Sequence, residues 1–183
     1  MRKKNWFIIP LMLVVGLLFG CYKIESVSRP KIQYAEFQFV LKYELNGELK
    51  VIEDTIICRY NGERFVDTRG TYHDWSMDFM SGNKKVTLFQ VKNESGKVMR
   101  EFYFYVGNAE YYMNDECDYK QRGPQTLDYV SYTVYDEIGN VMYSSSLSAE
   151  EAFRRFKIKL IDFNGSPPIS NDFEQITVKK LLP

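Results

Sequence analysis

The sequence predicts an all-β fold: an antiparallel sandwich or barrel of about eight strands with one short helix, after an N-terminal signal or anchor segment. Three observations support this prediction. Apolar residues recur at every second position from Ile32 onward, which is the period of a half-buried strand. Turn-forming residues separate these runs at intervals typical of sandwiches and barrels. Aromatic residues, which favour strands, make up 16% of the 183 residues.

The first hairpin has the clearest signal. Residues 37–43 alternate between apolar and polar side chains, and residues 49–58 are rich in β-branched side chains. Asn46-Gly47 lies between them and indicates a type I′ turn, because both central positions of that turn need a positive φ. Further strands are expected at residues 86–91, 98–106, 129–135, 141–145, 156–163 and 175–181.

Two later turns resemble each other in sequence. Residues 93–99 and 136–142 share an acid or amide at the start, a glycine three positions on, and a Val-Met pair at the end. Turns demand Gly and Asn or Asp for local reasons. We therefore interpret both segments as hairpin turns rather than as copies of a duplicated module.

One short helix is expected over residues 148–156. Ser148 and Glu151 match the capping box, in which the serine hydroxyl and the glutamate carboxylate satisfy free backbone N–H groups. Ala152, Phe153 and Phe156 then form one apolar face.

The N-terminus predicts export. Three basic residues, 2–4, precede a charge-free segment that is almost wholly apolar from Trp6 to Phe19, as in a secretory signal peptide. Leu18, Gly20 and Cys21 resemble the lipobox of bacterial lipoproteins, whereas Phe19 departs from the usual small or β-branched residue. The resemblance covers only residues 1–21. It implies cleavage before Cys21, lipidation of Cys21 with a diacylglyceryl group, and localisation on the extracytoplasmic face of a cell membrane.

Two alternatives to lipidation remain, namely an uncleaved single-pass anchor and free secretion. The 18 uncharged residues are close to the lower limit for a membrane-spanning helix. The expected organisation is a signal peptide at 1–20, a tether at 21–31 and a single β domain at 32–183. Removal of residues 1–20 would leave 21 basic and 24 acidic residues, so the membrane attachment is expected to come from acyl chains or the helix.

The chain has three cysteines. Lipidation of Cys21 leaves Cys58 and Cys117, which are candidates for a disulfide in an oxidising compartment. The alternative is two separate buried thiols that act as small apolar residues.

The charge balance disfavours one class of partner. The full chain carries 24 basic and 24 acidic residues, whereas proteins that bind nucleic acid are usually basic. A single histidine, His73, argues against histidine-rich metal sites. Asp74 beside it could orient the imidazole for general-base chemistry, but neighbours in an extended segment point to opposite faces. We expect no metal, no cofactor and no catalytic residue.

Acids and aromatics are densest between residues 110 and 119, which we interpret as a loop. Tyrosines present a large contact area at little conformational cost, so this loop is the candidate binding surface. Its candidate residues are Tyr111, Tyr112, Asp115, Glu116, Asp118 and Tyr119.

The expected function is non-catalytic binding by a membrane-tethered extracytoplasmic lipoprotein, with an envelope protein or a saccharide as the partner. One alternative is a hydrolase of envelope polymers that uses two carboxylates as acid and base. Another is the ectodomain of a single-pass membrane protein.

Overall fold

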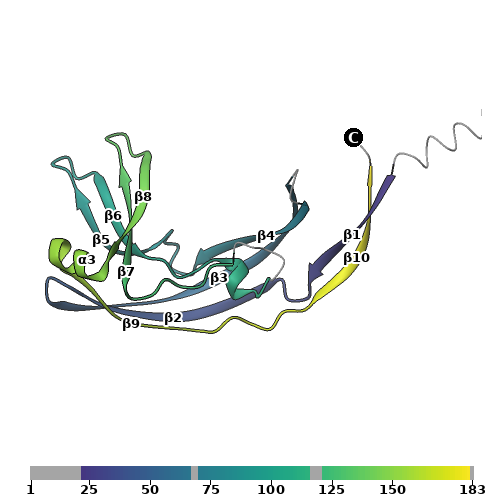
Figure 1. The fold of residues 1–183 in the computed structure, drawn as a ribbon, viewed down its shortest axis with the longest axis horizontal. Helices are drawn as coiled ribbons and strands as arrows, with labels where there is room; N and C mark the ends of the chain where they lie inside the picture. Colours follow the sequence, from purple (N-terminus) through teal and green to yellow (C-terminus); the bar gives the residue numbers. More distant parts are fainter. Residues whose placement is uncertain (1–21, 67–69, 116–120, 182–183) are drawn as a thin grey trace, which may run out of the picture. The chain divides into compact units, whose positions relative to one another are not determined.

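The computed structural model describes residues 22–66, 70–115 and 121–181, and the fold is all-β and antiparallel (Figure 1). The described part holds ten strands rather than about eight, and two helices rather than one. The elements in chain order are β1 Tyr22–Pro30, β2 Tyr34–Leu45, β3 Glu48–Val66, β4 Gly70–Phe79, β5 Val86–Lys92, β6 Val98–Phe104, α2 Ala109–Tyr112, β7 Tyr129–Tyr135, β8 Val141–Ser148, α3 Ala149–Phe156, β9 Ile158–Gly165 and β10 Phe173–Leu181.

The chain divides into two compact units. The smaller unit contains an antiparallel ribbon of β1 and β10, in which Tyr22 lies opposite Leu181 and Pro30 lies opposite Phe173. The prediction of a tether at 21–31 is therefore wrong for residues 22–30, because every one of these residues pairs with a residue of β10. The larger unit, residues 32–171, contains the other eight strands and both helices.

Two four-stranded sheets make up the larger unit. One has the strand order β4-β3-β2-β9 and the other has the order β5-β6-β7-β8. β2 and β3 form the predicted two-residue hairpin, with φ of 55° at Asn46 and 81° at Gly47, as a type I′ turn requires. The strand β4 was not predicted: Trp75, Met77 and Phe79 alternate with Ser76 and Asp78 in its second half, but residues 70–74 show no alternation.

The turn between β5 and β6 and the turn between β7 and β8 have the same backbone hydrogen bonds. Asn93 N–H donates to Lys97 O at 2.9 Å, and Asp136 N–H donates to Asn140 O at 3.0 Å. The glycine three positions after each of these residues has a positive φ, and the Asn93 or Asp136 side chain accepts a further backbone N–H. The sequence similarity of the two segments thus corresponds to a shared turn geometry.

The predicted helix α3 begins and ends as its sequence indicates. The Ser148 hydroxyl accepts the Glu151 N–H at 3.2 Å, and Lys157 ends the helix in the left-handed conformation. The following strand therefore starts at Ile158, two residues later than predicted. Ala152 is buried, and the Phe156 ring lies 4.4 Å from the Phe102 ring of β6.

One hydrophobic core joins the two sheets of the larger unit. Phe163 of β9 packs against Phe39 of its own sheet at 5.9 Å between ring centroids, and against Phe104 of the other sheet at 4.8 Å. The buried Tyr43 hydroxyl donates to Leu88 O at 3.1 Å and so adds a hydrogen bond between β2 and β5. Burial raises the pKa of this phenol, which stays a donor at neutral pH, although nearby Lys50 acts in the opposite direction.

Candidate functional site

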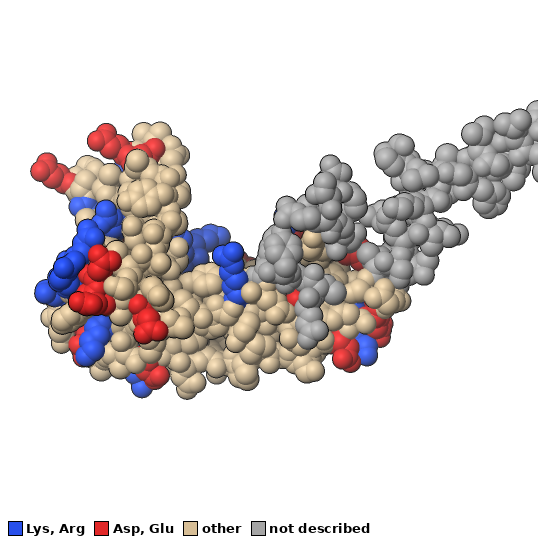
Figure 2. All heavy atoms as spheres, viewed as in Figure 1, with Lys and Arg blue, Asp and Glu red and all other residues tan. Residues whose placement is uncertain are grey.

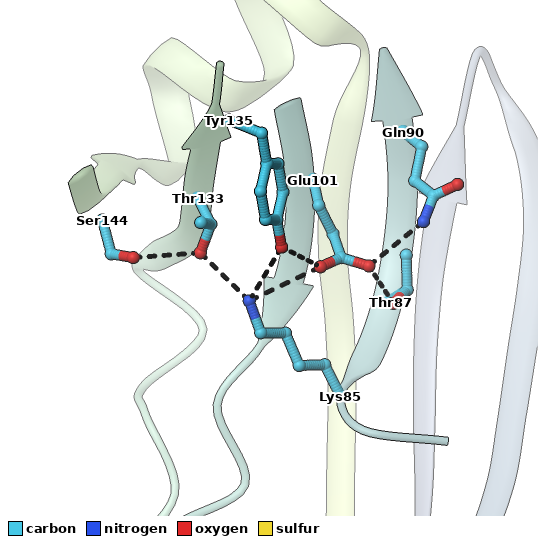
Figure 3. Close-up of polar contacts among 7 residues, drawn as sticks. All are labelled: Lys85, Thr87, Gln90, Glu101, Thr133, Tyr135 and Ser144. Carbon is cyan, nitrogen blue, oxygen red and sulfur yellow. Dashed lines mark hydrogen bonds and ion pairs between the residues drawn. The ribbon is translucent and has the colours of Figure 1, made fainter. Parts of the chain in front are cut away.

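The sheet β5-β6-β7-β8 has one apolar and one polar face. Along β6, Phe102 and Phe104 point into the core, whereas Glu101 and Tyr103 point the other way. Because Glu101 lies opposite Thr133 on β7, and Thr133 lies opposite Ser144 on β8, polar side chains from neighbouring strands meet on one face. We call this surface the polar face; it carries Lys85, Thr87, Gln90, Glu101, Thr133, Tyr135 and Ser144 (Figure 3).

Glu101 is the centre of the hydrogen-bond network on the polar face. Its Oε1 accepts the Thr87 hydroxyl at 2.9 Å and the Gln90 amide at 3.1 Å, and its Oε2 accepts the Tyr135 hydroxyl at 3.0 Å. Lys85 Nζ lies 3.4 Å from the same Oε2. Burial raises the pKa of this carboxyl, but the three hydrogen bonds and Lys85 together outweigh it, so that the pKa is lowered overall. Glu101 is thus an ionised carboxylate at neutral pH.

Lys85 is enclosed by the same strands. Its Nζ donates to the buried Thr133 hydroxyl at 3.0 Å and to the Tyr135 hydroxyl at 3.5 Å. It also lies 4.4 Å from the centre of the Tyr103 ring, within the range of a cation–π contact. Thr133 in turn shares a hydrogen bond of 3.0 Å with Ser144 on β8. The network therefore links all four strands of the sheet and holds each polar group in one orientation (Figure 3).

A shallow hollow opens beside this network. Its volume is about 270 Å³, and it is lined by Gln90, Lys97, Val98, Glu101, Tyr135 and Gly139. The two hairpin turns meet at its outer end, where Lys97 Nζ donates to the backbone oxygen of Glu137. An amide, a carboxylate, a phenol and an ammonium group thus line one small space.

His73 belongs to a second polar cluster, which is buried. Its Nδ1 lies 2.8 Å from Asp115 Oδ2, and the Trp75 indole N–H donates to the same oxygen at 2.8 Å. The Tyr60 ring packs edge-on against His73 and Trp75. The acid beside the imidazole is therefore Asp115, 42 residues along the chain, and not the neighbouring Asp74 considered from the sequence.

The predicted binding loop is only partly a surface. Tyr112 is 1% exposed and Asp115 is fully buried, so neither residue can present its side chain to a partner, and the assignment of these two residues was wrong. The Tyr112 ring packs on Phe37 at 4.8 Å, and its hydroxyl donates to Val106 O at 2.6 Å. Tyr111 is half-buried against the core. Glu116, Asp118 and Tyr119 lie outside the described residues.

The cysteine predictions have separate outcomes. Cys58 on β3 is a fully buried free thiol, and burial raises its pKa to about 12, with a smaller contribution from Glu110. It therefore behaves as a small apolar core residue. Cys117, its candidate disulfide partner, and Cys21, the predicted lipidation site, lie outside the described residues.

The polar face was not identified from the sequence. Lys85 follows Lys84 just before a strand and Glu101 follows Arg100 within one, and charges on the solvent side of a strand are common. The alternation of Arg100, Glu101, Phe102 and Tyr103 shows that Glu101 and Phe102 point to opposite faces. It does not reveal that Tyr135, 34 residues away, reaches the same carboxylate.

Comparison of the chain with protein-family models, with curated proteins and with solved structures yields no match. In the described ranges, no helix is long and apolar enough to cross a membrane. The same residues contain no group of three or more His, Cys, Asp or Glu side chains placed to hold a metal ion.

The burial of Tyr112 predicts a large loss of stability on truncation. Tyr112→Ala removes a packed ring and leaves the Val106 carbonyl without this donor. We therefore expect the free energy of unfolding to fall by about 3–5 kcal/mol. Tyr129→Ala, at a tyrosine that is 52% exposed, is the matched control and should change stability by less than about 1 kcal/mol. Urea denaturation followed by circular dichroism measures both. Equal effects of the two substitutions would contradict the placement of Tyr112 in the core.

The lowered pKa of Glu101 predicts a pH-dependent contribution to stability. Its carboxylate stabilises the fold above the unfolded-state pKa of about 4.3, and this contribution is lost as the pH falls through the lower folded-state pKa. We therefore expect Glu101→Gln to be less stable than the native chain at pH 7, with the difference shrinking below about pH 4. Denaturant titrations at pH 7, 5, 4 and 3 test this, and a difference that does not vary with pH would refute it.

Proposed function

We propose that this chain is a lipid-anchored protein of the extracytoplasmic face of a bacterial membrane, whose β domain binds an envelope saccharide and catalyses no reaction. The observation that carries the binding proposal is the hollow of about 270 Å³ on the polar face, with its carboxylate, amide, phenol and ammonium groups. Sugars offer many hydroxyl groups, which both donate and accept hydrogen bonds. A site with fixed donors and acceptors suits such a ligand better than it suits an apolar one.

The anchor proposal rests on the lipobox-like sequence that ends at Cys21. Strand β1 begins at Tyr22, directly after this cysteine. An acyl group on Cys21 would thus be attached to the residue that directly precedes the β1–β10 ribbon. Such an anchor would keep the start of the ribbon at the membrane surface.

The hollow on the polar face is lined by a single carboxylate, Glu101, and this favours binding over two-carboxylate hydrolysis at that site. A two-carboxylate hydrolase needs one acid that keeps its proton near neutral pH, whereas the pKa of Glu101 is lowered. A larger hollow of about 480 Å³ is lined by two acids, Glu53 and Asp54. The Asp54 carboxylate accepts the Ser81 hydroxyl at 2.5 Å and the Thr55 N–H at 2.7 Å. Asp54 thereby holds the loop after β4 in place, which is a structural role.

Metabolic labelling with a fatty acid tests the anchor. The native chain should incorporate the label, whereas Cys21→Ser should not, because the lipobox-like sequence predicts acylation of the Cys21 thiol. Detection of equal label in both chains would contradict acylation at Cys21. Membrane association of an unlabelled native chain would instead support the single-pass anchor.

Co-sedimentation with insoluble bacterial cell-wall polysaccharide tests the binding surface. The full chain in mild detergent should be retained, and the double variant Gln90→Ala/Lys97→Ala should bind about fivefold more weakly, as expected for the loss of about 1 kcal/mol of hydrogen bonding. Asp162→Asn, an exposed change on β9 of the other sheet, is the control and should bind like the native chain. Equal binding by the double variant would exclude the hollow as the site, and no retention of the native chain would exclude this ligand class.

A further inference from the structure

Strand β8 is an exposed edge of its sheet. In the described structure it pairs with β7 alone, so the hydrogen-bonding groups along its other side have no partner strand (Figure 1). Every residue of β8 except Leu147 is exposed. The eight residues from Val141 to Ser148 include no charge and no proline. Figure 2 shows the corresponding uncharged surface along this margin of the sheet.

Two of the other edges of the two sheets, β5 and β9, carry features that oppose pairing. β5, the opposite edge of the same sheet, has two register shifts in its pairing with β6 and ends in Lys92. β9, an edge of the other sheet, has exposed Lys159 and Asp162 side chains. Bulges and charges of this kind normally prevent edge-to-edge association. β8 has no charge and no proline, and its one register shift with β7 lies at its start, between Val141 and Tyr143, whereas the pairing from Tyr143 to Ser148 is regular.

Apolar side chains are exposed at one end of this edge. Val141, Met142 and Tyr143 are 60%, 64% and 49% exposed, and Ile138 in the preceding turn is 78% exposed. A contiguous group of exposed apolar residues on a sheet margin is typical of an interaction surface. A strand added to β8 would lie against Val141, Met142 and Tyr143 and would also pair the backbone groups on the open side of β8.

We propose that β8 pairs antiparallel with β8 of a second copy of this chain, so that two four-stranded sheets become one sheet of eight strands. The central sequence Ser144-Ser145-Ser146 is the reason to favour a second copy over a different partner. In an antiparallel pair related by a two-fold axis, the axis is perpendicular to the sheet and keeps each side chain on its own face. Opposite residues in an antiparallel pair point to the same face, so a residue cannot lie opposite its immediate neighbour in the copy. One residue must therefore lie on the axis, opposite the same residue of the copy.

That axial residue is a serine in any register centred on β8. If Ser144 lies on the axis, Val141 faces Leu147 of the copy; if Ser145 lies on the axis, Met142 faces Ser148. A charged residue at the axis would be repelled by its own copy, whereas two serine hydroxyls can hydrogen-bond to each other, because each both donates and accepts. The two-fold axis would also make the polar faces of the two copies continuous, with a hollow on each.

Cysteine cross-linking of the full chain tests this pairing. Opposite residues in antiparallel strands have Cα atoms about 4.5–5.5 Å apart, which is within the range of a disulfide. Under mild oxidation we expect Ser144→Cys or Ser145→Cys to form a reducible homodimer. Ser95→Cys, an exposed serine in the turn beyond β5, is the matched control, and the native chain controls for its own cysteines. Neither control should cross-link.

Charge variants provide an independent readout that needs no new cysteine. Ser145→Lys and Ser145→Glu should each weaken self-association by about fivefold or more, measured by sedimentation of the full chain in detergent, and a mixture of the two should associate again. Unchanged circular dichroism would show that both variants fold. Absence of a homodimer with both cysteine variants would overturn the proposal, as would cross-linking to a protein of different mass or association that neither charge weakens.

Discussion

The packing of aromatic rings between the two sheets is the constraint on which the larger unit depends. Each sheet has one apolar face, and neither face can be left in water without a large free-energy cost. Phe163 fills the space between them by contacting Phe39 on one side and Phe104 on the other. Phe156 of α3 covers Phe102 in the same way. Once these rings are buried, the strict alternation along β6 decides which residues face outward.

The polar face is a direct consequence of that alternation. Because Phe102 and Phe104 are buried, Glu101 and Tyr103 must lie on the opposite side, where Lys85, Thr133 and Tyr135 meet them from neighbouring strands. A carboxylate at this position is stabilised by three hydrogen bonds and a lysine, and this is also what keeps it ionised. The same contacts hold the walls of the hollow rigid, so that a ligand would not have to order them on binding.

The free edge of β8 has a related cause. The chain leaves β8 at Ser148, which caps α3, and α3 then packs on the core side of the sheet instead of beside β8. The following strand, β9, joins the other sheet next to β2. The connection therefore covers the apolar face and leaves the edge of the sheet unpaired.

The sequence by itself determined the strand class, the Asn46-Gly47 turn and the helix capped by Ser148, because each depends on residues close together in the chain. It also placed most strand boundaries within two or three residues. The sequence did not predict that residues 22–30 pair with β10. These two strands are separated by nearly the whole chain, and they pair through backbone groups that every residue carries.

The candidate sites were decided by the tertiary structure. A dense run of acids and tyrosines resembles a surface loop, yet Asp115 and Tyr112 are buried because His73, Trp75, Phe37 and the Val106 carbonyl supply partners from other segments. Glu101, in contrast, follows Arg100 in an ordinary strand sequence and becomes the centre of a network only when four strands lie side by side. Burial and hydrogen bonding depend on distance in space, and a local pattern of residue types carries no information on which distant residues will come together.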